Sequence, residues 1–197
     1  MTDSTMSRED IIRALSELVR FLKVSNSRVE IRIVGGAALA LRYLERQATR
    51  DIDSLAFKTD ENEAVVAAIQ AVAEKLSLPP DWLNTEVTKV DAFPTMGKDV
   101  EWETIFNESG VQILIPVAEV LLVMKLKANR PGRDTPDIRG LLNQLEFKTL
   151  ASIEALYESY YPGEVLPERA AGTAVRILEE HESYFSNPPG PPKFNIH

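Results

Sequence analysis

The sequence predicts an α/β protein of the α+β kind, in which a mixed β-sheet is flanked by helices and a helical C-terminal half closes over it. Before about residue 115, short segments alternate apolar and polar residues as half-buried strands do, and helical stripes separate them. After that point the apolar residues recur only at helical spacing. At 197 residues the chain can bury about two-thirds of its unfolded surface, which is enough for one large domain.

The first elements are a helix, a strand and a tight turn. Ser7 is the predicted N-cap of the helix, and Asp10 stands at the third helical position, so the two side chains can cap the first turn. The strand is Val29–Val34, with apolar residues at alternate positions. Gly35-Gly36 then lets the backbone turn tightly, and a helix of small residues follows from Ala37.

A second strand and a second long helix complete the front of the chain. The strand is predicted over Asp51–Phe57. Asp60 and Glu63 resemble a capping box, and an apolar stripe then runs at helical spacing to Leu76. The proline pair at residues 79–80 is expected to end this helix.

A short helical turn and a β-hairpin come next. Pro80 is predicted to start the turn, which carries Trp82 and Leu83. Within residues 100–115, two β-rich segments flank Asn107–Gly110, a typical polar hairpin turn.

The rest of the chain is predicted to be helical. Pro116 is expected to open the helix Val117–Ala128, which is apolar nearly all round and must therefore be buried. After a break at Arg130–Arg133, Thr135 is expected to cap a helix with Pro136 at its first position. Two further helices are predicted at Thr149–Tyr161 and Pro167–Phe185. We thus expect a core at residues 1–115, a helical half at 116–185 and a flexible, Pro-rich tail at 186–197.

The acidic pair at the start of the second strand is the main chemical feature. Asp51 and Asp53 are two residues apart on a strand, so their side chains project to the same side. Two carboxylates held that close repel each other unless a cation lies between them, and Mg²⁺ prefers oxygen ligands of this kind. The pair is therefore predicted to bind metal.

The glycine turn is predicted to bind phosphate. Gly35 and Gly36 carry no Cβ, so their backbone can approach a ligand closely. The helix from Ala37 presents free N–H groups and the positive end of its dipole to an anion. Arg50, directly before the acidic pair, is a further candidate for phosphate binding.

Composition excludes several classes of site. The chain has no cysteine, which rules out disulfides, thiolate zinc sites and cysteine nucleophiles. His181 and His197 are its two histidines, so a histidine-based triad or zinc site is not expected. Because no apolar run approaches the roughly 20 residues of a membrane span, and residues 1–10 are polar, we expect a cytoplasmic protein with no membrane partner.

Net charge and its distribution point in different directions. The formal charge of −8 argues against a general nucleic-acid coat, because sequence-independent binding depends on positive charge. Basic residues nevertheless gather before the acidic pair and again near residue 130, which predicts a locally basic cleft for a polyanion. The alternative is that they lie on solvated helix faces with acidic partners. The candidates for contacting RNA are Arg46, Lys127, Arg130 and Arg133.

Lys125 is a lone cation among apolar neighbours on a predicted buried helix. A lysine is rarely buried without a partner, and a triphosphate or Asp137 would supply one. The alternative is that its stem covers apolar surface while the ammonium group reaches solvent.

Several motifs together resemble a known superfamily. Gly35-Gly36 followed by Asp51-Ile52-Asp53 is similar to the signature of the polymerase-β-type nucleotidyltransferases, whose fold has a mixed sheet with flanking helices. Val34–Leu41, Thr49–Asp53, Leu121–Leu126 and Asp137–Arg139, in this order, resemble the AbiEii/MenT-like branch, mostly toxins of type IV toxin–antitoxin systems.

The resemblance assigns roles by position. Asp53 matches the main metal-binding aspartate, and Asp51 matches a first position that is Ser or Thr in some relatives. Lys125 matches a lysine that contacts the nucleoside triphosphate, and Asp137 matches a late catalytic acid. The superfamily usually has a third carboxylate on a later strand. Glu103, on the predicted hairpin, is a weak candidate, since a glutamate there is more often the polar face of a half-exposed strand.

The implied reaction transfers a nucleoside monophosphate from an NTP to an acceptor hydroxyl, with Mg²⁺ or Mn²⁺ as cofactor. By resemblance the acceptor is an RNA 3′ end, such as that of transfer RNA, and the enzyme is a toxin with a cognate antitoxin protein as partner. One alternative is a nucleotidyltransferase that modifies small molecules of the antibiotic type. The other is a non-catalytic regulator that binds nucleotide or protein.

Overall fold

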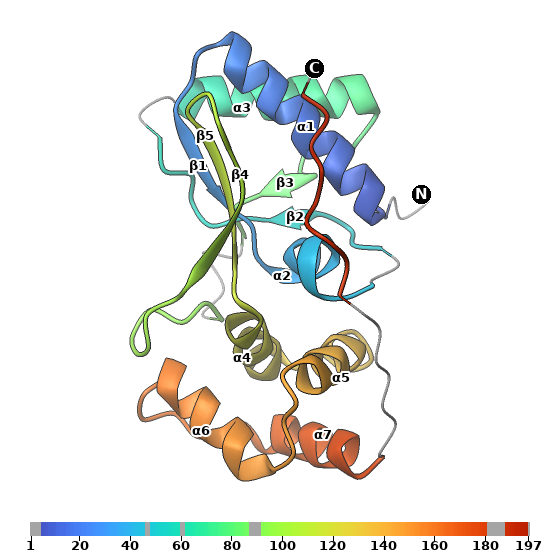
Figure 1. Ribbon diagram of the computed structural model, residues 1–197, viewed down its shortest axis with the longest axis vertical. Coiled ribbons are helices and arrows are strands. Elements are labelled where there is room, and N and C mark those ends of the chain that lie inside the picture. Colours follow the sequence, from blue (N-terminus) through green and yellow to red (C-terminus); the bar gives the residue numbers. More distant parts are fainter. Residues whose placement is uncertain (1–4, 46–47, 60–61, 87–91, 181–187, 197) are drawn as a thin grey trace.

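The computed structural model describes residues 5–45, 48–59, 62–86, 92–180 and 188–196. A sheet half and a helical half are stacked along the long axis (Figure 1). The sheet half contains, in chain order, α1 (Arg8–Val24), β1 (Val29–Arg32), α2 (Gly35–Ala38), the π-helix η1 (Leu39–Tyr43), β2 (Ile52–Asp53), α3 (Asn62–Leu76), β3 (Leu83–Asn84), β4 (Trp102–Glu108) and β5 (Val111–Pro116). The helical half contains α4 (Ala118–Ala128), α5 (Thr135–Gln144), α6 (Leu150–Tyr160) and α7 (Glu168–Glu179).

The strands form two small sheets that meet at the end of β1. The larger sheet has the order β1-β5-β4, with β1 parallel and β4 antiparallel to β5. The smaller sheet pairs β2 with β3 in parallel. An antiparallel bridge between Ile33 and Ser54 joins the two sheets. The predicted combination of a mixed sheet with flanking helices is therefore confirmed.

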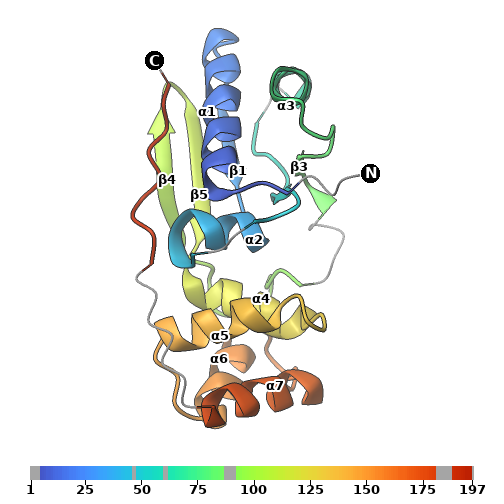
Figure 2. The ribbon, with the colours of Figure 1, turned by 90° about the vertical axis from the view of Figure 1, so that its right-hand side faces the viewer.

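The first helix forms as its sequence predicts. The Ser7 side chain accepts a hydrogen bond from the Asp10 N–H at 3.1 Å, and the Asp10 carboxylate accepts one from the Ser7 N–H at 3.0 Å. This capping box satisfies two backbone groups that the first turn leaves free. α1 then packs against α3 at the end of the sheet half farthest from α4 (Figures 1 and 2).

Two expected elements near the acidic pair differ from the prediction. Instead of a strand over Asp51–Phe57, only Ile52–Asp53 pairs as β2, because the chain beyond it makes isolated bridges to β1 and its end. The predicted helical turn at Trp82 and Leu83 is wrong, since Leu83 pairs with Ile52 in β3. Trp82 is fully buried and its indole N–H donates to the Ile69 carbonyl at 3.1 Å. The proposed capping residue Asp60 lies outside the described residues.

The helix α4 is buried on nearly every side, as its sequence predicts. Its start and the cap of the next helix are corrected by the structure. Pro116 is the last residue of β5, and Val117 is the N-cap of α4. The N-cap of α5 is Asp134, so Thr135 is the first residue of that helix. The Asp134 side chain makes no cap hydrogen bond, because it binds two cations instead.

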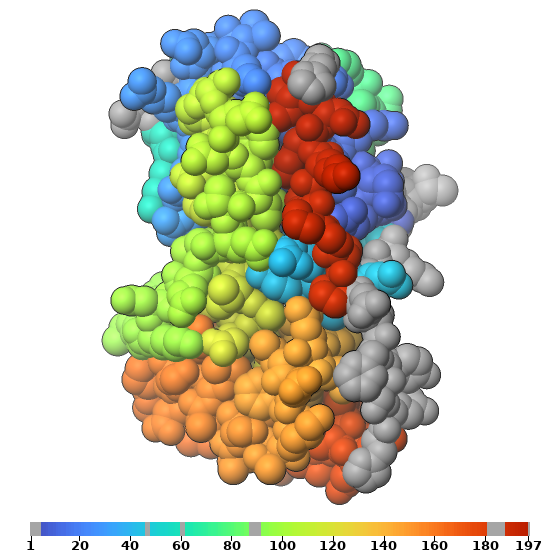
Figure 3. Space-filling view, in the orientation of Figure 1, coloured from blue at the N-terminus to red at the C-terminus, as the bar shows by residue number. Residues whose placement is uncertain are grey.

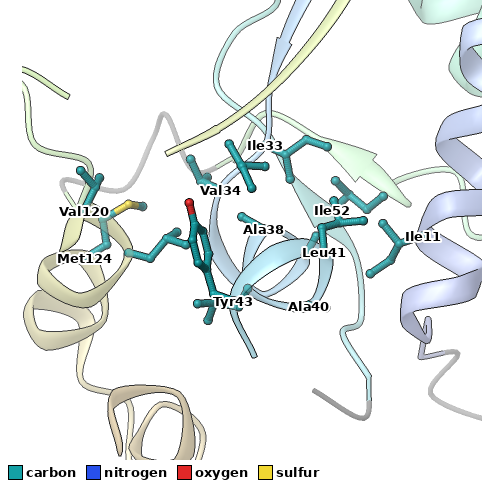
Figure 4. Packing of buried hydrophobic residues seen from close by; sticks show 14 of the residues in the cluster. Ile11, Ile33, Val34, Ala38, Ala40, Leu41, Tyr43, Ile52, Val120 and Met124 are labelled. Carbon is teal, nitrogen blue, oxygen red and sulfur yellow. The ribbon is translucent and has the colours of Figure 1, made fainter. Parts of the chain in front are cut away.

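One apolar core joins the two halves. Figure 4 shows Tyr43 lying between the residues around Ile33 and those of α4. Its hydroxyl donates to the Pro116 carbonyl at 3.1 Å, and its ring is buried with Val120 and Met124 in the same cluster. The sheet half and the helical half are thus held together by shared packing.

Part of the predicted flexible tail has a defined path. Residues 188–196 have no regular secondary structure and lie along the sheet half, beside β4 (Figures 1 and 3). Arg8 donates to the Gly190 carbonyl at 2.6 Å and Arg20 to the Asn195 carbonyl at 2.7 Å. The Phe194 ring meets Phe106 edge to face, with centroids 5.4 Å apart. Side chains distant in sequence therefore hold this segment.

Among the helices that the structure describes, none is long and apolar enough to cross a bilayer.

Candidate active site

A glycine turn carries the backbone from β1 into α2. Gly35 has a φ of +64°, a left-handed conformation in which a residue with a side chain is strained. A Cβ on Gly35 would lie 3.0 Å from Oδ2 of Asp53, so the backbone lies directly against this carboxylate. The helix begins at Gly35 and not at the predicted Ala37, which is fully buried and does not line the cavity described below.

The short strand β2 is held on both sides. On one side the Val34 N–H donates to the Asp53 carbonyl at 2.9 Å, which places the end of β1 beside the acidic pair. On the other side the Ser54 N–H donates to the Asn84 carbonyl at 2.9 Å. Backbone pairing with two neighbours therefore fixes the position from which the Asp53 side chain projects.

The electrostatics around Asp53 reflect two opposed groups of neighbours. Burial raises the pKa of Asp53, and the negative charge of Asp51 raises it further. The charges of Arg130 and Arg133 and a hydrogen bond with Asn84 lower the pKa, but they do not outweigh the first two effects. The Asp53 carboxyl therefore holds its proton more readily than a free one, and a bound cation would favour its ionised form.

The glycine turn and the acidic pair open into a cavity of about 260 Å³. One wall comes from the sheet half and contains the turn, the pair and part of the segment after β3. The other wall comes from α4 and the loop that follows it, which contributes two arginines. The lining residues are Gly35, Gly36, Thr49, Asp51, Asp53, Glu86, Ala92, Leu121, Met124, Lys125, Ala128, Arg130 and Arg133.

Lys125 lines this cavity, and its ammonium group is almost wholly buried. Its side chain is 7% exposed, so the alternative in which the ammonium group reaches solvent is wrong. Nζ lies 2.8 Å from Asp134 Oδ1 and 2.8 Å from Asp137 Oδ2. Asp137 is thus a partner of Lys125, as one of the two alternatives predicted. Asp137 itself does not line the cavity.

Asp134 connects Lys125 to Arg130. Its carboxylate accepts hydrogen bonds from Arg130 Nε at 3.0 Å and from the Arg130 backbone N–H at 2.8 Å. Burial alone would raise the pKa of Asp134, but the hydrogen bonds from Arg130 and Lys125 hold that pKa well below its usual range. The carboxylate therefore stays ionised and fixes the guanidinium of Arg130 at the rim of the cavity.

Other candidate residues lie away from the cavity. Glu103 binds Arg42 at 2.8 Å and accepts from the Tyr43 hydroxyl at 3.3 Å, so it cannot be the third carboxylate of this site. Lys127 pairs with Glu164 at 2.9 Å. Arg50 is exposed and adjoins the acidic pair without lining the cavity. Arg46 lies outside the described residues.

Three polar residues of the site were not predicted from the sequence. Asn84 contacts Asp53, and its Oδ1 accepts from the Glu86 N–H at 2.9 Å. Glu86 brings a further carboxylate to the lining. The Thr49 hydroxyl donates to the Asp51 carbonyl at 3.2 Å. Recognising Leu83-Asn84 as a strand beside Ile52-Asp53 would have pointed to the first two.

The acidic pair fits a divalent cation. Both carboxylates line one cavity, and the effect of Asp51 on the pKa of Asp53 shows that their charges act on each other. Hard oxygen ligands of this kind suit small divalent ions. Across the described ranges, no group of three or more His, Cys, Asp or Glu side chains is placed to hold a metal ion. A cation here would therefore be bound by the two carboxylates and would take its remaining ligands from elsewhere than a third side chain of these types.

Comparison with known proteins supports one class of chemistry. No curated protein and no solved structure matches the chain at a significant level. Residues 10–165 match the model of a family described as "Nucleotidyltransferase of unknown function (DUF6036)". Enzymes of this class generally use a nucleoside triphosphate and a divalent metal. Because the match covers most of the chain and includes the glycine turn, the acidic pair and Lys125, the protein belongs to this nucleotidyltransferase family.

Proposed function

We propose that this enzyme transfers a nucleoside monophosphate from an NTP to the 3′ hydroxyl of an RNA. The observation that carries the proposal is the convergence of the Gly35 turn, Asp51, Asp53 and two arginines on one cavity. The turn offers backbone without a Cβ, the carboxylates suit a cation, and the arginines suit phosphate.

The acidic pair has the first role. Asp51 and Asp53 would hold Mg²⁺ or Mn²⁺, which when bound supplies charge neutralisation to the triphosphate and the departing pyrophosphate. Gly35 and Gly36 line the same cavity and would bring their backbone close to the phosphate oxygens. Arg50, exposed beside the pair and outside the cavity lining, would bind a phosphate that extends beyond the cavity.

The helical half has a positioning role. Arg130 and Arg133 line the cavity, and their charges lower the pKa of Asp53, so a triphosphate in this cavity would lie near both the cations and the carboxylates. Asp137 binds Lys125, Lys125 binds Asp134, and Asp134 in turn orients Arg130. The apolar side chains of Leu121 and Met124 give the nucleobase a surface to pack on.

Charge and resemblance support RNA as the acceptor. The chain has a net charge of −8, yet the Arg133 side chain at the mouth of the cavity has no ion pair within the described ranges. A local positive charge in an acidic protein steers a polyanion to one place. The motifs also resemble those of the AbiEii/MenT-like toxins, so we propose a toxin role with a cognate antitoxin.

The test incubates the purified protein with each radiolabelled NTP and total RNA, with Mg²⁺, with Mn²⁺ and with EDTA. We expect label in RNA that depends on the metal and falls by about a thousandfold in Asp53→Asn. Asp99→Asn changes an exposed carboxylate outside the cavity and should keep full activity. Label in a small-molecule acceptor and not in RNA would favour the antibiotic-modifying alternative. No transfer to any acceptor would favour a regulator.

The toxin role needs a separate test in cells. Induced expression of the wild-type chain should arrest growth, and Asp53→Asn should not. Co-expression of the neighbouring gene should restore growth if that gene encodes the antitoxin. Normal growth on wild-type expression, with activity retained in the extract, would contradict the toxin role and leave the transferase activity standing.

A further inference from the structure

A second cavity lies on the helical half, next to the candidate active site. It has a volume of about 400 Å³ and is formed by the loop after α4 and one face of α7. We call it the arginine groove. Its lining residues are Asn129, Pro131, Gly132, Thr135, Arg169, Gly172, Thr173 and Arg176.

The loop between α4 and α5 borders both cavities. Arg130 and Arg133 line the active-site cavity, whereas Asn129, Pro131 and Gly132 line the arginine groove. A strand that leaves the active-site cavity over this loop would pass from the first pair of arginines into the groove. The two cavities are therefore placed to bind parts of one extended ligand.

The groove has two cations without partners. Arg169 and Arg176 are both exposed and lie about two turns apart on α7, so they share one face of the helix. In the part of the chain that the structure describes, neither side chain has an ion pair or a hydrogen bond. Two neighbouring cations do have ion-pair partners: Arg139 pairs with Glu180, and Lys127 pairs with Glu164.

Asn129 adds a buried donor without an acceptor. The residue is 7% exposed, and its side-chain Nδ2 has no hydrogen-bond partner among the described residues. A buried donor left unpaired is unfavourable, and native structures rarely keep one. Asn129 lines the groove, and because Nδ2 itself is enclosed, the amide would have to turn toward the groove to donate to an oxygen atom of a ligand.

Two glycines keep the groove open. Gly132 has a φ of +69°, and a Cβ on it would meet nothing within 4 Å. Gly172 lies between the two arginines on α7, and a Cβ there would also meet nothing. Both positions therefore leave room for a ligand to approach the backbone.

We propose that the arginine groove binds the backbone phosphates of the RNA acceptor upstream of its reacting 3′ end. Arginine forms bidentate hydrogen bonds with phosphate, and the Asn129 amide donates to a phosphate or sugar oxygen. The arginines lie about 10 Å apart along the helix axis, a span that suits a chain of phosphates better than one ion. This inference rests on the proposed function, because it extends the acceptor site of that reaction.

The test measures how salt affects binding of a short, fluorescein-labelled single-stranded RNA. In the double variant Arg169→Gln/Arg176→Gln, loss of two phosphate contacts should weaken binding by about tenfold or more and reduce the slope of log affinity against log salt by about 1.4. The matched control, Arg13→Gln/Arg28→Gln, removes two exposed arginines from the sheet half and should behave like the wild type. Binding of a fluorescent ATP analogue should be unchanged in both.

Asn129→Gly tests the neutral contact. Glycine keeps the left-handed backbone at this position, where φ is +31°, and removes the amide. We expect a severalfold weaker affinity for RNA, an unchanged salt slope and no fall in melting temperature. A structural role alone would lower the melting temperature and leave the affinity as it was.

The outcomes separate this inference from the proposed function. If the groove variants bind RNA as the control does, the groove assignment is wrong. The proposed reaction is then still tested separately, by transfer of label from NTP to RNA with the wild type. If the groove variants lose binding of ATP or of inorganic phosphate instead, the groove belongs to the nucleotide, and RNA binding there is excluded. If RNA is bound through the groove but never labelled, the groove stands and the proposed reaction fails.

Discussion

Oδ2 of Asp53 lies 3.0 Å from the point where a Cβ on Gly35 would stand. The left-handed turn and the carboxylate are therefore packed directly against each other, and neither can change without the other. This contact makes the glycine part of the site and not only of the fold.

The first prediction concerns Gly35→Ala. The new methyl group would press on the Asp53 carboxylate and displace it, so we expect transfer activity to fall by at least about a hundredfold. The positive φ should also cost about 1–2 kcal/mol of unfolding free energy. Gly163→Ala is the matched control, because Gly163 has a φ of +81° and a Cβ there meets nothing within 4 Å. Both variants should lose stability in urea, and an equal loss of activity in both would contradict the role of the contact.

The second prediction concerns Lys125→Met, which leaves Asp134 and Asp137 without their shared cation. Removal of one partner from a buried ion pair costs about 3–5 kcal/mol. We expect the free energy of unfolding, measured in urea at neutral pH, to fall by an amount near the lower end of this range, since Arg130 still binds Asp134. Lys127→Met, on the same helix, breaks a more exposed pair and should cost only about 0–1 kcal/mol.

The pH dependence of Lys125→Met gives a further check. Because folding lowers the pKa of Asp134 below its ordinary value of 3.8, its ionised form stabilises the protein above that pH. This contribution is lost as the pH falls through the folded pKa. The difference in unfolding free energy between wild type and Lys125→Met should therefore shrink in acid. A constant difference down to strongly acidic pH would show that lost packing, and not lost charge, is the cause.

The parts of the structure that follow from local sequence were predictable. The capping box of Ser7 and Asp10, the glycine turn and the buried helix α4 each depend on residues within a few positions of one another. Asp51 and Asp53 do line one cavity, but Asp51 lies at a bend just before β2, so the predicted placement of both residues on one strand holds only for Asp53.

The parts that depend on long-range contacts were not predictable. Glu103 suits a metal site by residue type, but folding brings it to Arg42, far away in the sequence. The Pro-rich composition of residues 188–196 is typical of disorder, whereas Arg8 and Arg20 bind the backbone carbonyls of that segment. Carbonyl groups exist at every residue, so no pattern of side chains reveals such contacts.

The third prediction concerns this C-terminal segment. Phe194→Ala removes a half-buried ring that meets Phe106 edge to face, so the unfolding free energy should fall by about 1–2 kcal/mol. Lys193→Ala, an exposed neighbour, should change it by no more than about 0.5 kcal/mol. Urea denaturation of the full chain measures both. Equal stability of Phe194→Ala and wild type would show that the segment leaves the sheet half in solution.

The last prediction concerns Asp53→Asn in the absence of metal. Burial and the charge of Asp51 raise the pKa of Asp53 in the folded state above its ordinary value of 3.8, so the folded protein takes up a proton more readily than the unfolded one. The stability of the wild type should therefore fall as the pH rises from 3.8 through the folded pKa. At neutral pH the ionised carboxylate thus lowers the free energy of unfolding. Asp53→Asn removes this destabilising charge and should be more stable than the wild type in EDTA at pH 7, with the difference in stability shrinking in acid.

Added Mg²⁺ should raise the melting temperature of the wild type and not of Asp53→Asn, because a ligand stabilises only a state that binds it. Asp99→Asn should follow the wild type throughout. An Asp53→Asn protein that is less stable than the wild type in EDTA, or that gains as much from Mg²⁺, would show that the repulsion between Asp51 and Asp53 is not what a metal relieves.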